Sequence, residues 1–352
     1  MVNSYIKTVI LYCLQQINGE RSIYSVFHLL NGKKSSQTIQ DAHLFQMTRF
    51  FKSYQWLSRE EFEKIIAEIH NHKLVTETAN QHCLLTDKGK ALLQDQLNKN
   101  NIPPFLDGWN YHLLAGVFWE RFSLLVQVCS NLIHHNPTYL PIQQKYETQF
   151  WLKSFLQQSS TKRKELAKRL YDEMINCFES ENAPNPTGLV IRLTGHNRIG
   201  LTPMQASSYL KQEFTYYHLQ FLNSLHYMIK TIQLQSNQYP LLHSIITDVT
   251  TPFSFTISTE KTYALLKNNI SLDKIVEIRK LKRNTIEDHI VEIALLDEGF
   301  DISPFVNPEK QKLILLAANK AGSKQLRQIR NLTSGVDYFE IRLVLAKYGE
   351  QK

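Results

Sequence analysis

The chain has 352 residues, a net charge of +8 and a hydrophobic share of 43%, which describe an ordinary globular protein with about two or three domains. The positive charge is spread over the whole chain and forms no basic tail, so it permits nucleic-acid binding without requiring it. The four cysteines are isolated from one another in apolar surroundings. This excludes a zinc site built on CxxC pairs and predicts reduced core thiols.

The apolar segments predict buried helices and no membrane span. The N-terminus, MVNSYIKTVILYCLQQING, lacks the basic-then-apolar layout of a secretory signal. The most apolar segment, residues 111–133, is interrupted near its centre by Glu120 and Arg121. We therefore expect a cytoplasmic, nucleoid-associated protein.

The first part of the chain, residues 1–98, has the outline of a winged-helix domain. Apolar residues recur at helical spacing over residues 2–17 and 22–30. Ser58 and Glu61 form a capping box that begins a later helix. Two short strands are predicted at 74–78 and 82–85, followed by a helix at 87–98. A helix followed directly by a two-stranded wing is typical of winged-helix domains.

The middle part, residues 109–250, is predicted to be a helical domain. It lies between the polar boundary NKNNIPPFLDG and the segment VTTPFSFTISTE at 249–260. Residues 109–182 have a continuously helical pattern rich in aromatic residues, which indicates a core more than a base-stacking platform. Thr202 and Pro203 are a suitable cap and first residue for another helix.

The last part, residues 258–352, contains the pattern of a helix-turn-helix in SLDKIVEIRKLKRNTIEDHIVEI, residues 271–293. Thr285 and His289 fit the usual pattern of the second helix in such motifs. The apolar residues that we expect to face inward are Leu272, Ile275, Val276 and Ile278 on the first helix, and Ile286, Ile290, Ile293 and Ala294 on the second.

The charges of this motif favour a grip on the DNA backbone over the reading of bases. Basic residues gather at the turn, and Lys280 stands where glycine is usual; they are Arg279, Lys280, Lys282 and Arg283. Asn284, Glu287, Asp288 and Glu292 are expected to face outward on the second helix, where carboxylates would repel phosphates. A purely structural helix pair remains an alternative.

No cluster of residues predicts catalysis, a metal site or a cofactor. The segment LNGKKSS resembles the end of a nucleotide-binding loop, but Phe27 stands where that loop requires its first glycine. The motifs HExxH and GxSxG are absent from the sequence. The sequence therefore predicts a protein that is not an enzyme.

Two segments resemble accessory modules of DNA helicases. TYALLKNNISLDKIVEIRKLKRNTIEDHIVEIALLDEGFDI and the closing LRQIRNLTSGVDYFEIRLVLAKYG resemble the helix-turn-helix domain at the C-terminus of some RecQ-type helicases. INGERSIYSVFHLLNGKKSSQTIQDAHL, with the wing at 74–85, resembles the winged helix that follows the motor in those enzymes. The size and order of the parts resemble the YpbB family of bacilli and related bacteria.

This resemblance implies a detached accessory protein of a RecQ-type helicase that acts in DNA replication, recombination or repair. It also implies that the winged helix can dock the acidic tail of single-stranded DNA-binding protein. The helicase motor and the zinc cysteines that accompany many RecQ winged helices are missing. The implied role would leave Glu287 and Asp288 to face a protein partner.

The residues that we expect to hold DNA come from both ends of the chain. They are Lys33, Lys34 and Lys73 in the N-terminal part, and Arg279, Lys280, Lys282, Arg283, Asn284, Thr285 and His289 in the C-terminal part. Two alternatives from other classes remain. One is a transcriptional regulator that binds one preferred duplex as a symmetric dimer, and the other is a scaffold that never touches DNA.

Overall fold

The computed structural model describes residues 4–79, 81–158, 163–249, 255–322 and 324–349. These residues are mostly helical and contain one small antiparallel sheet of two strands, as the sequence predicts. They divide into two compact units. The helix-turn-helix unit comprises the described residues of 9–94 and 252–352, and the central unit comprises those of 1–8 and 95–251.

The N-terminal part of the helix-turn-helix unit has the expected order of helices, a two-stranded hairpin and a closing helix. Its elements, two of which cross the unit boundary, are α1 (Tyr5–Ile17), α2 (Tyr24–Asn31), α3 (Ser36–Leu44), the 3-10 helix η1 (Thr48–Phe50), α4 (Arg59–Asn71), β1 (Val75–Ala79), β2 (His82–Leu85) and α5 (Asp87–Lys99). Ser58 and Glu61 form the predicted capping box at the start of α4. This reciprocal bonding fixes where the helix begins.

The wing is a regular hairpin with one irregularity. Val75 pairs with Leu85 and Glu77 with Cys83, and the register shifts between Glu77 and Ala79. The backbone at Ser22 makes an isolated antiparallel bridge to His82, which joins the hairpin to the segment before α2. The predicted strands at 74–78 and 82–85 are therefore confirmed to within one residue.

The C-terminal part of the same unit consists of helices. They are α14 (Ile257–Lys267), α15 (Leu272–Arg279), α16 (Arg283–Leu296), α17 (Pro308–Ala321), α18 (Leu326–Asn331) and α19 (Tyr338–Tyr348). The second helix of the helix-turn-helix, α16, packs against α14, α15 and α19. Ile286, Ile290 and Ile293 form its fully buried stripe, as predicted.

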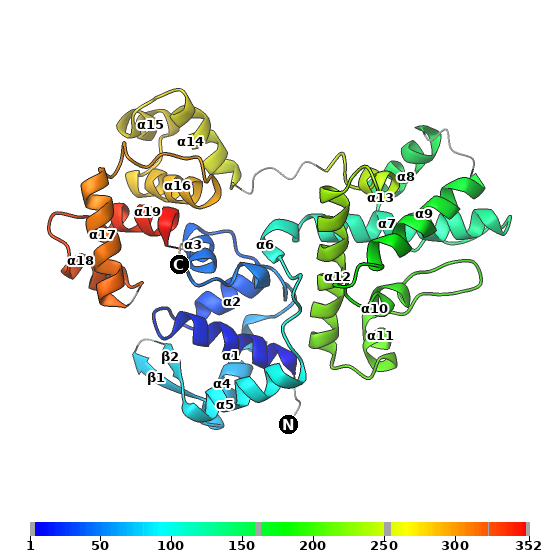
Figure 1. Ribbon diagram of the computed structural model, residues 1–352, viewed down its shortest axis with the longest axis horizontal. Coiled ribbons are helices and arrows are strands. Elements are labelled where there is room, and N and C mark those ends of the chain that lie inside the picture. Colours follow the sequence, from blue (N-terminus) through cyan, green and yellow to red (C-terminus); the bar gives the residue numbers. More distant parts are fainter. Residues whose placement is uncertain (1–3, 80, 159–162, 250–254, 323, 350–352) are drawn as a thin grey trace. The chain divides into compact units, whose positions relative to one another are not determined.

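The two parts of this unit are joined by α3, which packs against both α16 and α19 (Figure 1). Residues 1–98 and 258–352 were expected as separate domains, whereas residues 9–94 and the described part of 252–352 share one compact unit. The contact links helices that are at least 239 residues apart in the sequence, which local patterns cannot reveal.

The central unit is helical throughout its described core. Its elements after α5 are α6 (Gly108–Tyr111), α7 (Leu114–Ile133), α8 (Tyr146–Gln158), α9 (Arg163–Phe178), α10 (Thr187–Val190), α11 (Pro203–Tyr209), α12 (Phe214–Leu234) and α13 (Pro240–Ser244). The expectation of an uninterrupted helical stretch over 109–182 is wrong, because α7 ends at Ile133 and α8 begins only at Tyr146. Thr202 caps α11 as predicted.

The core of the central unit lies between α7, α9 and α12. Phe118 and Phe122 of α7 stack on each other in this core, with ring centroids 5.4 Å apart. The aromatic residues of this region are therefore largely core, as predicted, with Tyr146, Phe150 and Tyr171 as exposed exceptions. None of the helices in the described ranges combines the length and apolarity needed to cross a membrane. Part of the predicted boundary at 249–260 lies outside the described residues.

Candidate nucleic-acid interface

The turn between α15 and α16 is formed by residues 280–282. Lys280 adopts a left-handed backbone conformation with φ of 50°, at the position where glycine is usual. Lys282 is the N-cap of α16, and its side chain accepts no hydrogen bond from the helix. The first amide groups of α16 therefore lack the side-chain acceptor that Asn307 and Asp337 provide for α17 and α19.

Four polar residues around this turn are exposed, namely Lys280, Lys282, Arg283 and Asn284. Leu281 and Thr285 are half-buried. No carboxylate of the described residues pairs with Lys280 or Lys282. Uncapped amides and two unneutralised ammonium groups together form a positive surface at the N-terminus of α16.

Arg283 belongs to this surface but is already partly neutralised. Its Nη1 lies 2.5 Å from Asp273 Oδ1, and its Nε lies 3.1 Å from Glu287 Oε1. The hydrogen bond that Arg283 donates to Asp273 is the main cause that raises the pKa of Arg283. The guanidinium is held in place beside the turn, but the two carboxylates of the same unit neutralise part of its charge.

Arg279 has a structural role. Its guanidinium donates hydrogen bonds to the Ser258 carbonyl at 2.9 Å and to the Thr262 hydroxyl at 2.7 Å, both on α14. These bonds tie the end of α15 to α14. Arg279 therefore positions the turn, and both of its terminal nitrogens are already bonded to α14.

His289 is in a place that DNA cannot reach in this arrangement. The residue is 5% exposed, and its Nδ1 lies 2.9 Å from the Thr262 hydroxyl. Burial lowers its pKa, and Arg279 adds to the effect. We therefore leave His289 out of the interface, although its spacing fits the usual second helix.

The expectation that Glu292 faces outward is wrong. The residue is 2% exposed and accepts hydrogen bonds from the backbone amide of Thr256 at 2.5 Å and from the Thr259 hydroxyl at 2.7 Å. Burial raises its pKa, although these bonds oppose the shift. Ile278 was also misplaced, since it was expected inside and is 49% exposed.

Glu287 and Asp288 are both engaged inside the unit. Glu287 bonds to Arg283, and Asp288 Oδ1 lies 2.5 Å from Arg342 Nη2 on α19. They are not part of an open acidic face. A partner that used either carboxylate would first have to displace an arginine.

The N-terminal lysines lie on two separate elements. Lys33 and Lys34 are exposed in the loop between α2 and α3, and Lys73 is exposed between α4 and β1. The pKa of Lys34 is lowered by burial and by Lys52, while Glu292 of α16 opposes the shift. Lys34 is therefore close to Glu292 of α16.

Sequence analysis did not identify the residues that cover the surface of α16. Arg342 Nε donates to Gln40 Oε1 at 3.1 Å, which joins α19 to α3. Gln40 and Asp41 are two adjacent polar residues in the short helix α3, and both are buried. Buried polar side chains usually have specific hydrogen-bonding partners, so this pair was the available signal for a contact here.

The described residues contain no group of three or more histidine, cysteine or acidic side chains that could hold a metal ion. All four cysteines, Cys13, Cys83, Cys129 and Cys177, are buried and free. Burial raises the pKa of Cys129 and Cys177 to about 12. They are core thiols, as the sequence predicts.

Comparisons with known proteins agree with this geometry. A family model described as a helix-turn-helix domain matches residues 258–345, which include the turn and α16. This domain indicates DNA binding. No solved structure matches the chain. Protein YpbB of Bacillus subtilis (strain 168) is 36% identical over 350 residues, which cover 99% of each chain. An identity of this level over the full length shows that the chain belongs to the YpbB family.

Proposed function

We propose that this protein holds DNA by its phosphate backbone and acts as the accessory part of a RecQ-type helicase in DNA replication, recombination or repair. The observation that carries the proposal is the N-terminal turn of α16. Lys280 and Lys282 are exposed there and have no acidic partner among the described residues, while most of the residues farther along α16 are buried.

Base reading requires a recognition helix to lie in the major groove, with about three or four side chains reaching base edges. Helix α16 packs against α3, α14 and α19, which leaves few of its side chains open to a groove. Among the described residues of α16, Arg283 and Asn284 are the exposed ones. Amides and lysines at a helix terminus fix a backbone without reading sequence, which supports structure-directed binding over operator recognition.

Charge reversal tests the DNA part of the proposal. We expect Lys280→Glu with Lys282→Glu to weaken binding to a labelled 20-base-pair duplex at least tenfold, measured by fluorescence anisotropy. The matched control is Lys153→Glu with Lys230→Glu, which reverses two exposed lysines of α8 and α12 in the central unit. Equal affinity of the two variants would remove the proposed surface and favour a scaffold that does not use DNA.

A selection experiment with the wild-type protein tests the alternative of a transcriptional regulator. Selection from a random duplex library should return no consensus, because the buried face of α16 leaves few side chains to read bases. A palindromic consensus would contradict the proposal and indicate a dimeric transcriptional regulator.

The helicase part rests on the resemblance of both parts of the helix-turn-helix unit to RecQ accessory modules. We expect the protein to increase strand separation by a purified RecQ-type helicase that lacks these modules. The Lys280→Glu, Lys282→Glu variant should lose this stimulation, whereas the Lys153→Glu, Lys230→Glu variant should keep it. Equal unwinding with and without the protein would contradict the helicase role while leaving DNA binding intact.

We also propose that the winged helix docks the acidic tail of single-stranded DNA-binding protein. The support is the resemblance and the exposed cations Lys33, Lys34 and Lys73. A labelled acidic tail peptide should bind wild-type protein and lose affinity when these three lysines become alanine. Unchanged peptide affinity in that variant would contradict this assignment.

A further inference from the structure

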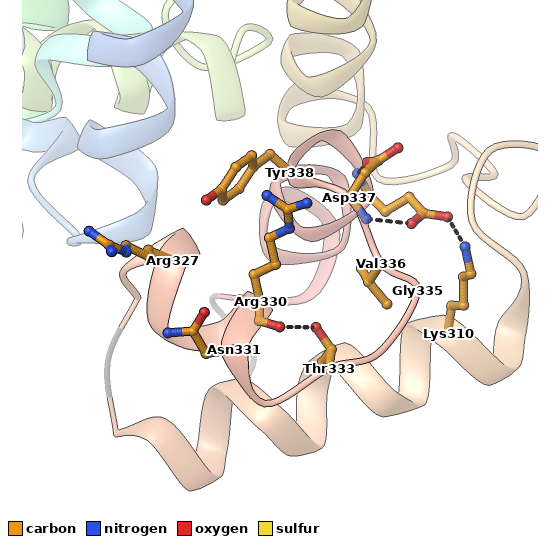
Figure 2. A pocket seen from close by; sticks show the side chains of 10 residues that line it. Lys310, Arg327, Arg330, Asn331, Thr333, Gly335, Val336, Asp337 and Tyr338 are labelled. Carbon is orange, nitrogen blue, oxygen red and sulfur yellow. Dashed lines mark hydrogen bonds and ion pairs between the residues drawn. The ribbon is translucent and has the colours of Figure 1, made fainter.

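A second cationic site lies at the other end of the helix-turn-helix domain, away from the turn at Lys280. It is a pocket of about 590 Å³ formed where α17, α18 and the start of α19 meet. Figure 2 shows Arg327, Arg330 and Asn331 on the α18 side and Lys310 on the opposite side. None of these residues was singled out by the sequence.

The charges of the pocket are unevenly compensated. Lys310 Nζ lies 2.6 Å from Glu340 Oε1, so its charge is neutralised within the pocket wall. Glu340 and Asp337 also cap α19 reciprocally, because each carboxylate accepts the other residue's backbone amide. No carboxylate of the described residues pairs with Arg327 or Arg330, so these two guanidinium groups remain available.

One of the two arginines is held in a defined orientation. The guanidinium carbon of Arg330 lies 4.6 Å from the ring centroid of Tyr338, and Figure 2 shows the two side chains next to each other. Stacking on an aromatic ring reduces the freedom that a guanidinium loses when it binds. The planar fork of arginine suits the oxygens of a phosphate group, which it can bind with two hydrogen bonds.

The loop that leads into α19 leaves its backbone open to a ligand. Gly335 has φ of 70°, and a Cβ atom added to it would meet no heavy atom within 4 Å. Tyr338 and Asn331 add polar groups for which the described residues offer no hydrogen-bond partner. Of the residues that line this pocket in the described chain, Val336 is the one aliphatic residue, and it is buried.

We propose that this pocket binds a phosphate group of the nucleic-acid backbone, as a second contact besides the turn before α16. The inference rests on the proposed function and adds a site to it. An acidic peptide is the other polyanion that the charges would accept. The lining favours nucleic acid, because the aliphatic residue among the described lining residues, Val336, is buried and offers no apolar anchor to a peptide beside the two guanidinium groups.

The test uses the full-length protein and a fluorescein-labelled 20-base-pair duplex in anisotropy titrations at several salt concentrations. We expect Arg327→Gln with Arg330→Gln to weaken binding about tenfold. The slope of log affinity against log salt should become shallower by about 1 to 2, since each lost phosphate contact removes about 0.9. The control is Lys312→Gln with Lys320→Gln, two exposed cations of α17 outside the pocket, which should change neither value.

A second pair of variants leaves every charge in place. Asparagine tolerates the left-handed conformation, so Gly335→Asn should fold while placing a side chain in the approach to the pocket. Gly322→Asn, at φ of 58° with the same open space around it, is the matched control. We expect only the Gly335 variant to lose DNA affinity, with equal melting temperatures for both.

The outcomes separate the two proposals. If wild-type protein binds no DNA, the proposed function and this site both fail. If Lys280 and Lys282 matter but the Arg327, Arg330 and Gly335 variants bind DNA like wild type, only this site fails. If those variants keep DNA affinity and lose binding to a poly-glutamate peptide, the pocket is an acidic-peptide site and the inference is overturned.

Discussion

Asp288 of α16 and Arg342 of α19 form an ion pair, with 2.5 Å between Asp288 Oδ1 and Arg342 Nη2. The same guanidinium donates through Nε to Gln40 of α3 at 3.1 Å. One arginine thus connects the second helix of the helix-turn-helix, α16, to α3 in the N-terminal part of the chain. This connection adds polar contacts to the packing of α16 against α3 and α19.

Removal of this arginine should loosen the helix-turn-helix unit. Gln40 is 3% exposed, so Arg342→Ala leaves its buried carbonyl oxygen without a donor. We expect the free energy of unfolding to fall by about 1–3 kcal/mol. Asp288→Asn keeps the bond to Gln40 and should cost at most about 1 kcal/mol. Urea melts and amide exchange of α16 check this, and an Arg342→Ala variant as stable as wild type would contradict it.

Replacing the buried Glu292 carboxylate by an amide should change the stability little, whereas truncating the side chain to alanine should lower it. Glu292→Gln keeps an acceptor for the Thr256 amide and removes the charge whose burial raises the pKa. We expect a change in unfolding free energy within about 1 kcal/mol for that variant. Glu292→Ala leaves the Thr256 and Thr259 donors unpaired and should cost about 2–4 kcal/mol.

The sign of the pH dependence at Glu292 follows from its raised pKa. Its stabilising contribution is complete below the unfolded pKa of about 4.5 and is lost as pH rises through the folded value. Glu292→Gln should therefore flatten the decline in stability from about pH 4.5 upward. Parallel urea-midpoint curves for wild type and Glu292→Gln would count against a raised pKa.

His226 gives the central unit the opposite pH dependence. Its ring is buried, and Nδ1 accepts the Asp107 backbone amide at 3.0 Å. Burial, with smaller effects of His112 and His218, lowers its pKa to about 3. The folded state then stays unprotonated between about pH 6.5 and 3 while the unfolded state gains a proton. The stability present above pH 6.5 should therefore decrease by up to about 1.4 kcal/mol for each unit that the pH falls below 6.5.

Urea melts followed by tryptophan fluorescence measure this effect, because Trp109, Trp119 and Trp151 all belong to the central unit. His226→Gln should be less stable than wild type at pH 8 but lose less stability between pH 6.5 and pH 5. If the variant and the wild type lose equal stability over that interval, His226 is not the group that titrates.

Substitution by alanine at two helical glycines should change the stability of the protein in opposite directions. A Cβ atom at Gly89 of α5 would lie 2.1 Å from the Leu74 carbonyl oxygen, whereas one at Gly116 of α7 would meet nothing within 4 Å. Gly89→Ala should cost about 1–3 kcal/mol through overpacking. Gly116→Ala should add about 0.5–1 kcal/mol by favouring the helix. Melting temperatures that move in the same direction would show that these local contacts are wrong.

Local signals in the sequence predicted the elements well. The capping pair Ser58 and Glu61 and the cap at Thr202 lie where expected, because each needs only residues within one turn. The wing strands follow from alternation within a few residues. The inward stripe of α16 follows from its 3.6-residue period.

The environment of α16 could not be predicted in the same way. Helical periodicity places Glu292 opposite the apolar stripe, yet Thr256 and Thr259 of α14 cover that side. Asp288 is likewise covered by a pair with α19. These contacts bring together residues 30 to 55 positions apart, and the contacts with α3 span at least 239 positions, so no local pattern reports them.

The salt dependence of DNA binding tests the central claim most directly. A protein that grips phosphates releases counterions, so log affinity should fall steeply and linearly with log salt. For wild type we predict a slope of log affinity against log salt with a magnitude of several units. The slope should become shallower by about 2 when Lys280 and Lys282 are both alanine, since each phosphate contact contributes about 0.9 on duplex DNA. A wild-type slope near zero, or the same slope in the variant, would contradict the claim.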